Sequence, residues 1–424
     1  MNKITLTALI TGILAISIIA IIYIESSNTK NEEAKLQWEV DLEHFAWDIT
    51  VADGKVFTSN YQATYCFNST NGQSLWNTSS KRNSILEFYQ ENVYTGTMGG
   101  IVNKLDKDTG EVLVQFPAPV TSSYGSKTAP EFYLADNKVF ALRDGIAVYD
   151  VNTEELLWET NYYTTIVANT SVNKPESDYI FIKGKLRYNP NNGSLIWYLQ
   201  GSHSPHLVVD QEQVIFWNYN PDHYDLGQNI LSVKASTGES IWSFDVGASV
   251  FHLTNYGDLL LFGSTKGYFY ALNVTDGSLV WSTHVDTQDL LLNYDYASAE
   301  GLFDASPVYV DSLNQRAYWG FVFDQDNADS QGDLCCLDIL TGDVIWTEQF
   351  QTNGSIARES LPDLVGLASL KNTIFFTANN HLWTFNKLIG NLTDVKIFDH
   401  YILPPVVVDN KVFIAADLFL FVYE

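Results

Sequence analysis

The chain has 424 residues, 46% of them hydrophobic, which is enough to bury a sizeable core. Its 50 acidic residues outnumber the 23 basic ones, and the net charge of −27 argues against binding to nucleic acid, whose phosphates it would repel. Three cysteines are too few for a disulfide framework, so the fold must be held by its core.

The N-terminus carries an apolar segment from Ile4 to Ile24, and these 21 uncharged residues are long enough to cross a membrane as a helix. Lys3 precedes the segment and Glu25 follows it, which favours export of the rest of the chain. No small-residue cleavage site follows, so we expect a transmembrane signal anchor over residues 1–24, with a cleaved signal peptide as the alternative. Residues 25–35 are polar and are expected to form a tether.

From residue 36 onwards the chain repeats one short pattern, in which a Gly turn precedes a Trp by four residues. Weaker copies have Val114 in the Trp position, or Trp158 without the glycine. Short aromatic and β-branched runs lie upstream of each turn and are typical of strands joined as hairpins. In the best copy these runs are Leu259–Gly263, Tyr268–Asn273 and Ser278–Thr283.

A four-stranded unit of about 40 residues indicates a β-propeller blade. Residues 36–424 are therefore predicted to form an all-β domain, a single propeller of four-stranded antiparallel blades. Leu36–Leu42 resembles an outer strand and the C-terminal residues resemble three inner strands, so the chain ends should pair and close the ring. The units number nine, one of them degenerate near residue 397. Each tryptophan is expected to dock on the next blade, a structural role that we assign to Trp38, Trp76, Trp158, Trp197, Trp242, Trp281 and Trp346.

The block YALNVTDGSLVW, which ends at Trp281, resembles the tryptophan-docking repeat of pyrroloquinoline quinone (PQQ) dehydrogenases and their BamB-like relatives. The resemblance covers nearly all of residues 36–424 and implies eight blades, beside the nine counted units. It implies either a non-catalytic scaffold outside the cytoplasm or a PQQ- and calcium-dependent quinoprotein dehydrogenase. A carbohydrate-active propeller is a third alternative and would require two facing carboxylates in the axial funnel.

The dehydrogenase alternative rests on Cys335 and Cys336, because the enzymes that the chain resembles carry an adjacent cysteine pair against the cofactor. Here the pair falls within a predicted third strand, where successive side chains point to opposite faces. We therefore expect ordinary buried cysteines, no bound PQQ and no catalytic residues. His203 and His206 are interpreted as histidines of a Pro-containing loop without a third metal ligand.

Blade topology predicts where a partner binds. The connections between second and third strands and those between blades share one face of a propeller, and the long insertions fall on these connections. We expect this face to bind a protein or glycan partner, with tolerated insertions as the alternative. The insertions are Pro117–Pro130, Asn218–Gln228, Asp286–Pro307, Asp324–Asp333 and Gln351–Pro362, and the binding residues expected on this rim are Tyr124, Tyr219, His223, Tyr224, Tyr294 and Tyr296.

One of these insertions contains Asp324, Asp326 and Asp329, which match the start of a calcium loop. Ala328 and Cys335 depart from that pattern, so a solvated acidic loop is the alternative. The chain is expected at the cell membrane as a single-pass protein with its propeller outside the cytoplasm. Glycosylation would then have seven sequons available, at Asn68, Asn77, Asn169, Asn192, Asn273, Asn353 and Asn391.

Overall fold

The structure is a computed structural model. It describes residues 33–42, 44–60, 62–79, 83–97, 100–119, 131–143, 145–161, 180–182, 186–198, 202–208, 213–219, 229–248, 250–264, 267–285, 303–323, 331–351, 365–378, 380–399, 401–416 and 418–424. The expected anchor, residues 1–24, and most of the tether lie outside these ranges. Among the described residues there is no helix that is long and apolar enough to cross a membrane.

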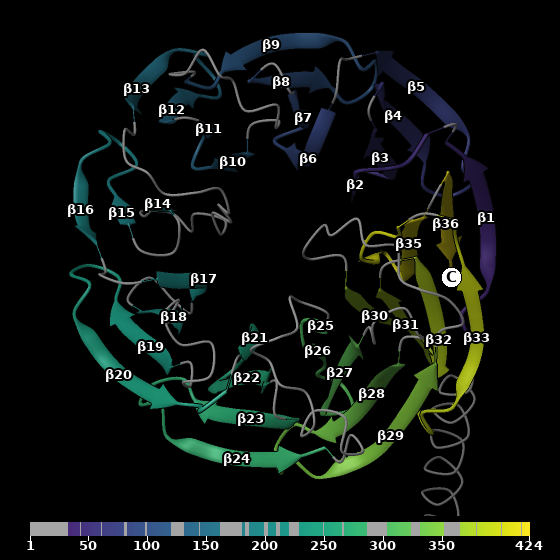
Figure 1. Cartoon of the computed structure of the whole chain (residues 1–424). Coiled ribbons are helices and arrows are strands. Elements are labelled where there is room, and N and C mark those ends of the chain that lie inside the picture. The colour runs from purple at the N-terminus through teal and green to yellow at the C-terminus, as the bar shows by residue number, and fades with distance from the viewer. Residues whose placement is uncertain are drawn as a thin grey trace, which may run out of the picture.

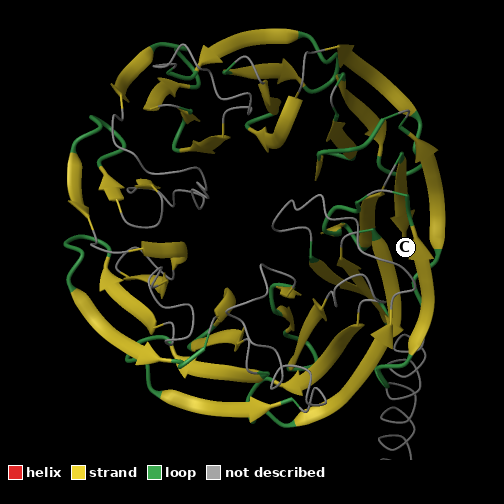
Figure 2. Cartoon of the chain, in the orientation of Figure 1, coloured by secondary structure: helices red, strands yellow, loops and turns green. Residues whose placement is uncertain are grey.

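The described strands form nine antiparallel sheets that stand in a ring (Figure 1). Figure 2 shows that the described elements are strands joined by loops. Eight sheets follow the four-strand plan, one of them with its first strand divided in two, and the remaining sheet has three described strands. The all-β propeller is confirmed, and the number of sheets matches the nine repeat units rather than the eight blades implied by the resemblance.

We number the blades in chain order. Blades 1 to 3 contain β2 (Asp48–Ala52), β3 (Lys55–Ser59), β4 (Ala63–Asn68), β5 (Ser74–Ser79), β6 (Asn83–Tyr89), β7 (Asn92–Thr97), β8 (Ile101–Asp106), β9 (Val112–Pro117), β10 (Glu131–Ala135), β11 (Lys138–Leu142), β12 (Gly145–Asp150) and β13 (Leu156–Asn161). Blades 4 to 6 contain β14 (Ile180–Ile182), β15 (Leu186–Tyr188), β16 (Leu195–Tyr198), β17 (Ser202–Val208), β18 (Gln213–Tyr219), β19 (Asn229–Lys234), β20 (Ser240–Asp245), β21 (Val250–Tyr256), β22 (Leu259–Ser264), β23 (Tyr268–Asn273) and β24 (Leu279–His284).

Blades 7 to 9 contain β25 (Phe303–Ala305), β26 (Tyr309–Asp311), β27 (Arg316–Phe323), β28 (Gln331–Asp338), β29 (Val344–Gln351), β30 (Gly366–Leu370), β31 (Thr373–Ala378), β32 (His381–Asn386), β33 (Leu392–Ile397), β34 (Val406–Val408), β35 (Lys411–Ala416), β36 (Phe419–Tyr423) and β1 (Leu36–Asp41). Blade 9 joins the two ends of the described chain, because β1 pairs with β36. Lys35 and Glu424 exchange two backbone hydrogen bonds of 2.9 Å just beyond this pair. The predicted closure is confirmed.

The core lies between neighbouring blades, where the apolar faces of adjacent sheets meet. At each of seven junctions a tryptophan of the outer strand docks on a glycine of the next blade, as expected. A Cβ atom on any of these glycines would lie 2.5 to 2.8 Å from the indole ring, so only glycine leaves room for the ring. The docked pairs are Trp38–Gly72, Trp76–Gly110, Trp158–Gly193, Trp197–Gly238, Trp242–Gly277, Trp281–Gly342 and Trp346–Gly390.

Six of these tryptophans also donate a hydrogen bond from Nε1 to a backbone carbonyl of the next blade. The acceptor is always the residue three positions before the docked glycine, as in Trp281 to the oxygen of Ile339, at 2.9 Å. The other five bonds measure 2.9 to 3.3 Å. Docking thus combines burial of a large ring with satisfaction of its polar atom.

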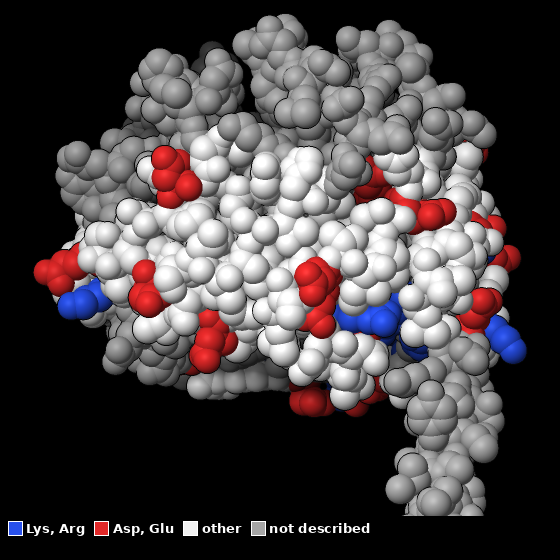
Figure 3. Space-filling model, turned by 90° about the horizontal axis from the view of Figure 1, so that it is seen from below, with Lys and Arg blue, Asp and Glu red and all other residues white. Residues whose placement is uncertain are grey.

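Every outer strand has a bulge at the residue before the Trp position. The bulge turns that residue outward, and in seven blades it is an exposed aliphatic side chain, such as Leu113 or Val280. The side of the ring in Figure 3 accordingly carries many uncharged side chains between its scattered acidic ones. The sequence pattern did not predict this bulge.

The junction between blades 2 and 3 lacks both docking residues. Val114 occupies the Trp position, and Glu154, with φ of 65°, occupies the glycine position. Lys104 stands opposite Val114 on the neighbouring strand, and its Nζ donates to the carbonyl of Val151 at 3.3 Å. Val151 is three positions before Glu154, so the ammonium group takes the acceptor that the indole uses elsewhere, and it also lies 3.9 Å from the Glu154 carboxylate.

The junction between blades 8 and 9 is the other departure. Asp394 stands in the Trp position of β33, opposite Thr384. Blade 9 has no Gly turn to receive an indole, because its third and fourth strands are the two ends of the described chain. Both tryptophan and glycine are therefore absent together at each of the two departures, which indicates that each residue is needed only where the other is present.

We predict that the pair at the junction of blades 2 and 3 is coupled. Val114→Trp alone should destabilise the protein by about 1–3 kcal/mol, because the ring would meet the Glu154 Cβ. The double variant Val114→Trp with Glu154→Gly should recover most of this loss. Urea denaturation of both single variants and the double variant measures the coupling, and additive effects would contradict it.

Candidate functional site

The two faces of the ring carry different connections. On the turn face lie the connections between first and second strands and between third and fourth strands, and none between described strands exceeds six residues. On the loop face lie the connections between second and third strands and between blades. β13 ends on the loop face at Asn161, and the next described strand, β14, begins on the turn face at Ile180. Every other interval of seven or more residues between described strands joins strand ends on the loop face.

The turn face is held by internal contacts. Six of the seven docked Gly turns begin with an Asp or Asn whose side chain accepts backbone N–H groups of the turn, as Asp106 Oδ1 does from Asp108 and Thr109 at 2.9 and 2.8 Å. The turn that ends at Gly238 begins with Lys234 instead. Asn68 and Asn273, two of the predicted glycosylation acceptors, use their side chains in the same way. Glycosylation of these two asparagines would break the turns, whereas Asn77 and Asn391 are exposed.

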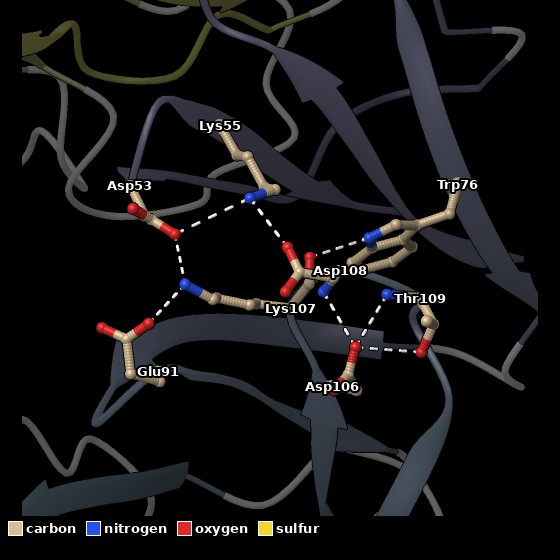
Figure 4. Close-up of polar contacts among 8 residues, drawn as sticks. All are labelled: Asp53, Lys55, Trp76, Glu91, Asp106, Lys107, Asp108 and Thr109. Carbon is tan, nitrogen blue, oxygen red and sulfur yellow. Dashed lines mark hydrogen bonds and ion pairs between the residues drawn. The ribbon is translucent and has the colours of Figure 1, made fainter.

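Figure 4 shows an ionic cluster between the turns of blades 1 and 2. The Lys107 ammonium contacts the carboxylates of Asp53 and Glu91, and Lys55 lies 3.0 Å from Asp108 and 3.7 Å from Asp53. The hydrogen bond from Lys107 holds the pKa of Asp53 below its usual range. Since the carbonyl of Lys107 also accepts the indole of Trp76, one residue joins the two blades twice.

A similar ion pair joins blades 7 and 8, and its side chains are less exposed to solvent. Lys387 occupies the same turn position as Lys107, and its Nζ lies 2.5 Å from Asp311, whose side chain is only 7% exposed. Burial opposes ionisation of Asp311, but the Lys387 and Asn314 hydrogen bonds hold its pKa below the usual value. These two sets of ion pairs on the turn face serve blade junctions, whereas the long insertions join strand ends on the loop face, so we take the loop face as the candidate binding surface.

The predicted rim residues belong to the insertions on the loop face. Tyr219 is the last residue of β18 and pairs through its backbone with Ser202. The remaining rim residues lie outside the described ranges, and their binding role stays a prediction: Tyr124, His223, Tyr224, Tyr294 and Tyr296.

The predicted calcium ligands Asp324, Asp326 and Asp329 also lie outside the described ranges. They fall between the end of β27 at Phe323 and the start of β28 at Gln331. The calcium prediction is therefore untested. The insertion is shorter than predicted, because Asp333 already belongs to β28. His203 and His206 were expected in a loop, and this was wrong: both lie in β17, with a bulge between them that the Pro-containing sequence accommodates.

The adjacent cysteines lie on β28, on opposite faces of blade 7. Cys335 packs in the core shared with blade 6, and Cys336 packs in the core shared with blade 8. Both are free and fully buried, and burial raises the pKa of the Cys336 thiol to about 12. Two thiols in separate cores cannot line one cofactor, so the pair does not fit the role that it has in quinoprotein dehydrogenases. This agrees with the prediction of ordinary buried cysteines.

Asp48 is a loop-face residue that the sequence analysis missed. It opens β2, where the carboxylate accepts the backbone N–H of Ile49 at 2.8 Å and that of Leu86, on the first strand of blade 2, at 2.6 Å. Burial of this carboxyl group raises its pKa from 3.8 to about 7, although the two hydrogen bonds oppose the shift. Asp48 therefore ties two blades together and titrates near neutral pH.

Asp333 and His381 occupy equivalent positions of the third strands in blades 7 and 8. Burial raises the pKa of Asp333 to about 6 and lowers that of His381 to about 4. The His381 ring stacks on Trp383 at 5.0 Å, and neither imidazole nitrogen has a hydrogen-bond partner among the described residues. Aligning the blades with one another would have revealed these two polar positions, which are apolar or small in most other repeats.

This ring of tryptophan-docked sheets defines the class of the protein: it is a PQQ-like repeat β-propeller. Within that class the sequence matches, over residues 29–185 and 182–416, the family described as "Outer membrane protein assembly factor BamB". The chain belongs to this family.

Three proteins similar to this chain are distant from it in sequence. Tetrathionate hydrolase from Acidithiobacillus ferrooxidans is 23% identical over 305 residues, which is 61% of this chain and 54% of the relative, so the chain spans about half the length of that protein. BamB from Moraxella catarrhalis is 13% identical with a TM-score of 0.50, covering 92% of this chain and 100% of that one. Quinohemoprotein alcohol dehydrogenase from Pseudomonas putida HK5 is 12% identical with a TM-score of 0.52, covering 92% and 76%. At these identities the two solved structures establish the fold alone.

We predict that Asp48 makes stability depend on pH. Because the folded-state pKa is raised, the folded protein is favoured by this group below pH 3.8 and loses that contribution as the pH rises through about 7. The stability of the wild type relative to Asp48→Asn should fall by about 3–4 kcal/mol over that interval. Urea denaturation of both proteins across it measures the difference, and a constant difference would contradict the raised pKa.

Proposed function

We propose that this protein is a membrane-anchored scaffold outside the cytoplasm, which binds a partner protein through its loop face and has no catalytic role. The observation that carries the proposal is the asymmetry of the ring. Its turn face is closed by short hydrogen-bonded turns, whereas the long insertions begin and end on the loop face. Loops on a rigid support are where recognition is most often placed.

The composition of the insertions supports recognition of a macromolecule. They are rich in Tyr, Asn, Asp and Ser, which supply large contact area and adaptable hydrogen bonds. The sequence leaves a protein and a glycan as alternatives. We favour a protein, because the family description names an assembly factor for outer-membrane proteins. The apolar segment 4–24 supports the proposed single-pass anchorage.

We predict that the partner contacts the loop face and not the turn face. A photocrosslinking amino acid at Tyr294 or Tyr296 should give a specific adduct in the native membrane, while the same group at Leu340, which is 55% exposed on a turn, should not. Mass spectrometry identifies the adduct. Equal products from both faces, or none from the rim, would argue against the proposal.

The alternative is a quinoprotein dehydrogenase, which the similarity to quinohemoprotein alcohol dehydrogenase keeps in view. The positions of Cys335 and Cys336 argue against it.

We predict no stoichiometric uptake of PQQ in the presence of Ca²⁺ when absorbance and calorimetry are recorded on the purified protein. Titration with Ca²⁺ alone, compared with a variant in which Asp324, Asp326 and Asp329 are all changed to Asn, tests the calcium loop. Tight uptake of PQQ would replace the scaffold proposal.

A further inference from the structure

The described chain enters and leaves the ring on the same face. β36 follows the connection from β35 at the loop face and runs to the turn face, where it ends at Tyr423. Leu36, the first residue of β1, pairs with Tyr423, and Lys35 and Glu424 are joined by two backbone hydrogen bonds. Both ends of the described chain are therefore held at the turn face.

A second contact holds the entry point independently. The backbone N–H of Ala34 donates to Thr373 Oγ1 at 2.9 Å. Thr373 opens β31, directly after the turn that follows β30, so it also belongs to the turn face, in blade 8. Ala34 further packs against the apolar cluster shared by blades 8 and 9. The chain upstream of residue 34 thus departs from the turn face.

The length of the tether then limits how the ring is oriented. Ile24, the last residue of the apolar segment, precedes Ala34 by ten residues, which span at most about 35 Å when fully extended. Blade strands of six residues separate the two faces by about 20 Å. With segment 4–24 in a membrane, the attachment point on the turn face lies within about 35 Å of the lipid, and the loop face lies about 20 Å further along the strands from that point.

We propose that the protein presents its loop face away from the membrane that anchors it, to a protein partner that approaches from the aqueous side. This inference rests on the proposed membrane anchorage and adds the direction of binding.

The native cysteines make the orientation measurable. Cys66, Cys335 and Cys336 are buried, so an impermeant maleimide should label an introduced cysteine and leave the wild type nearly unlabelled. Leu313→Cys marks the turn face, because Leu313 is 94% exposed between β26 and β27. Gln62→Cys and Asp399→Cys mark the loop face at two exposed positions, in blade 1 and beside blade 8.

The full chain carrying one donor label is reconstituted in liposomes whose outer leaflet contains an acceptor lipid. We expect stronger energy transfer from Leu313→Cys than from Gln62→Cys or Asp399→Cys. A Gly/Ser spacer inserted after Thr29 should reduce transfer from Leu313→Cys and narrow the difference. Equal transfer from the two faces, or stronger transfer from the loop face, would overturn the orientation.

Failure of the anchor has a different signature. If the chain does not float with the liposomes in a density gradient, the proposed anchorage is wrong and the orientation fails with it. If the chain floats but the transfer is reversed, the anchorage holds and only the direction of binding is wrong.

Discussion

The docking of an indole ring on a glycine of the next blade is the interaction on which the ring depends. A single sheet exposes two apolar faces, and only stacking against its neighbours buries them. The indole sets how closely two sheets approach at their outer edge, and its hydrogen bond sets their relative height. Since a side chain on the glycine would occupy the ring's place, each junction is specified by two residues on different blades.

At the two junctions without tryptophan, other contacts replace the docked Trp–Gly pair. At Val114 the indole is replaced by a lysine from the adjacent strand, which donates to the same carbonyl, and Glu154 occupies a position from which glycine is no longer required. At Asp394 there is no receiving turn, because the third and fourth strands of blade 9 are β36 and β1, from opposite ends of the described chain, and their pairing holds the blade instead. Compensation is therefore local to each junction.

The architecture could be predicted from the sequence because a glycine that receives the preceding blade's tryptophan and a tryptophan that docks on the next blade stand four positions apart, so the contacts between blades appear as a short repeated motif. The roles of Lys104 and Asp48 could not, since they depend on which residue of a neighbouring strand or blade lies opposite. His203 and His206 were misplaced because a bulge permits a strand where proline suggests a loop. The positions of Cys335 and Cys336 were predicted correctly, because alternation along a strand is a local property. The rim tyrosines outside the described ranges remain predictions.

The direction of docking has a consequence for how such a ring changes in evolution. Blades 1 and 4 to 7 each donate an indole to the next blade and offer a glycine to the preceding one, so duplication of such a unit would bring a complete pair of docking residues with it. Gain or loss of a whole unit would leave every remaining junction matched, and only the angle between neighbours would have to adjust. A ring with nine described sheets, in a family whose relatives are expected to have eight, would then differ from them by one module, and its neighbours would need no redesign.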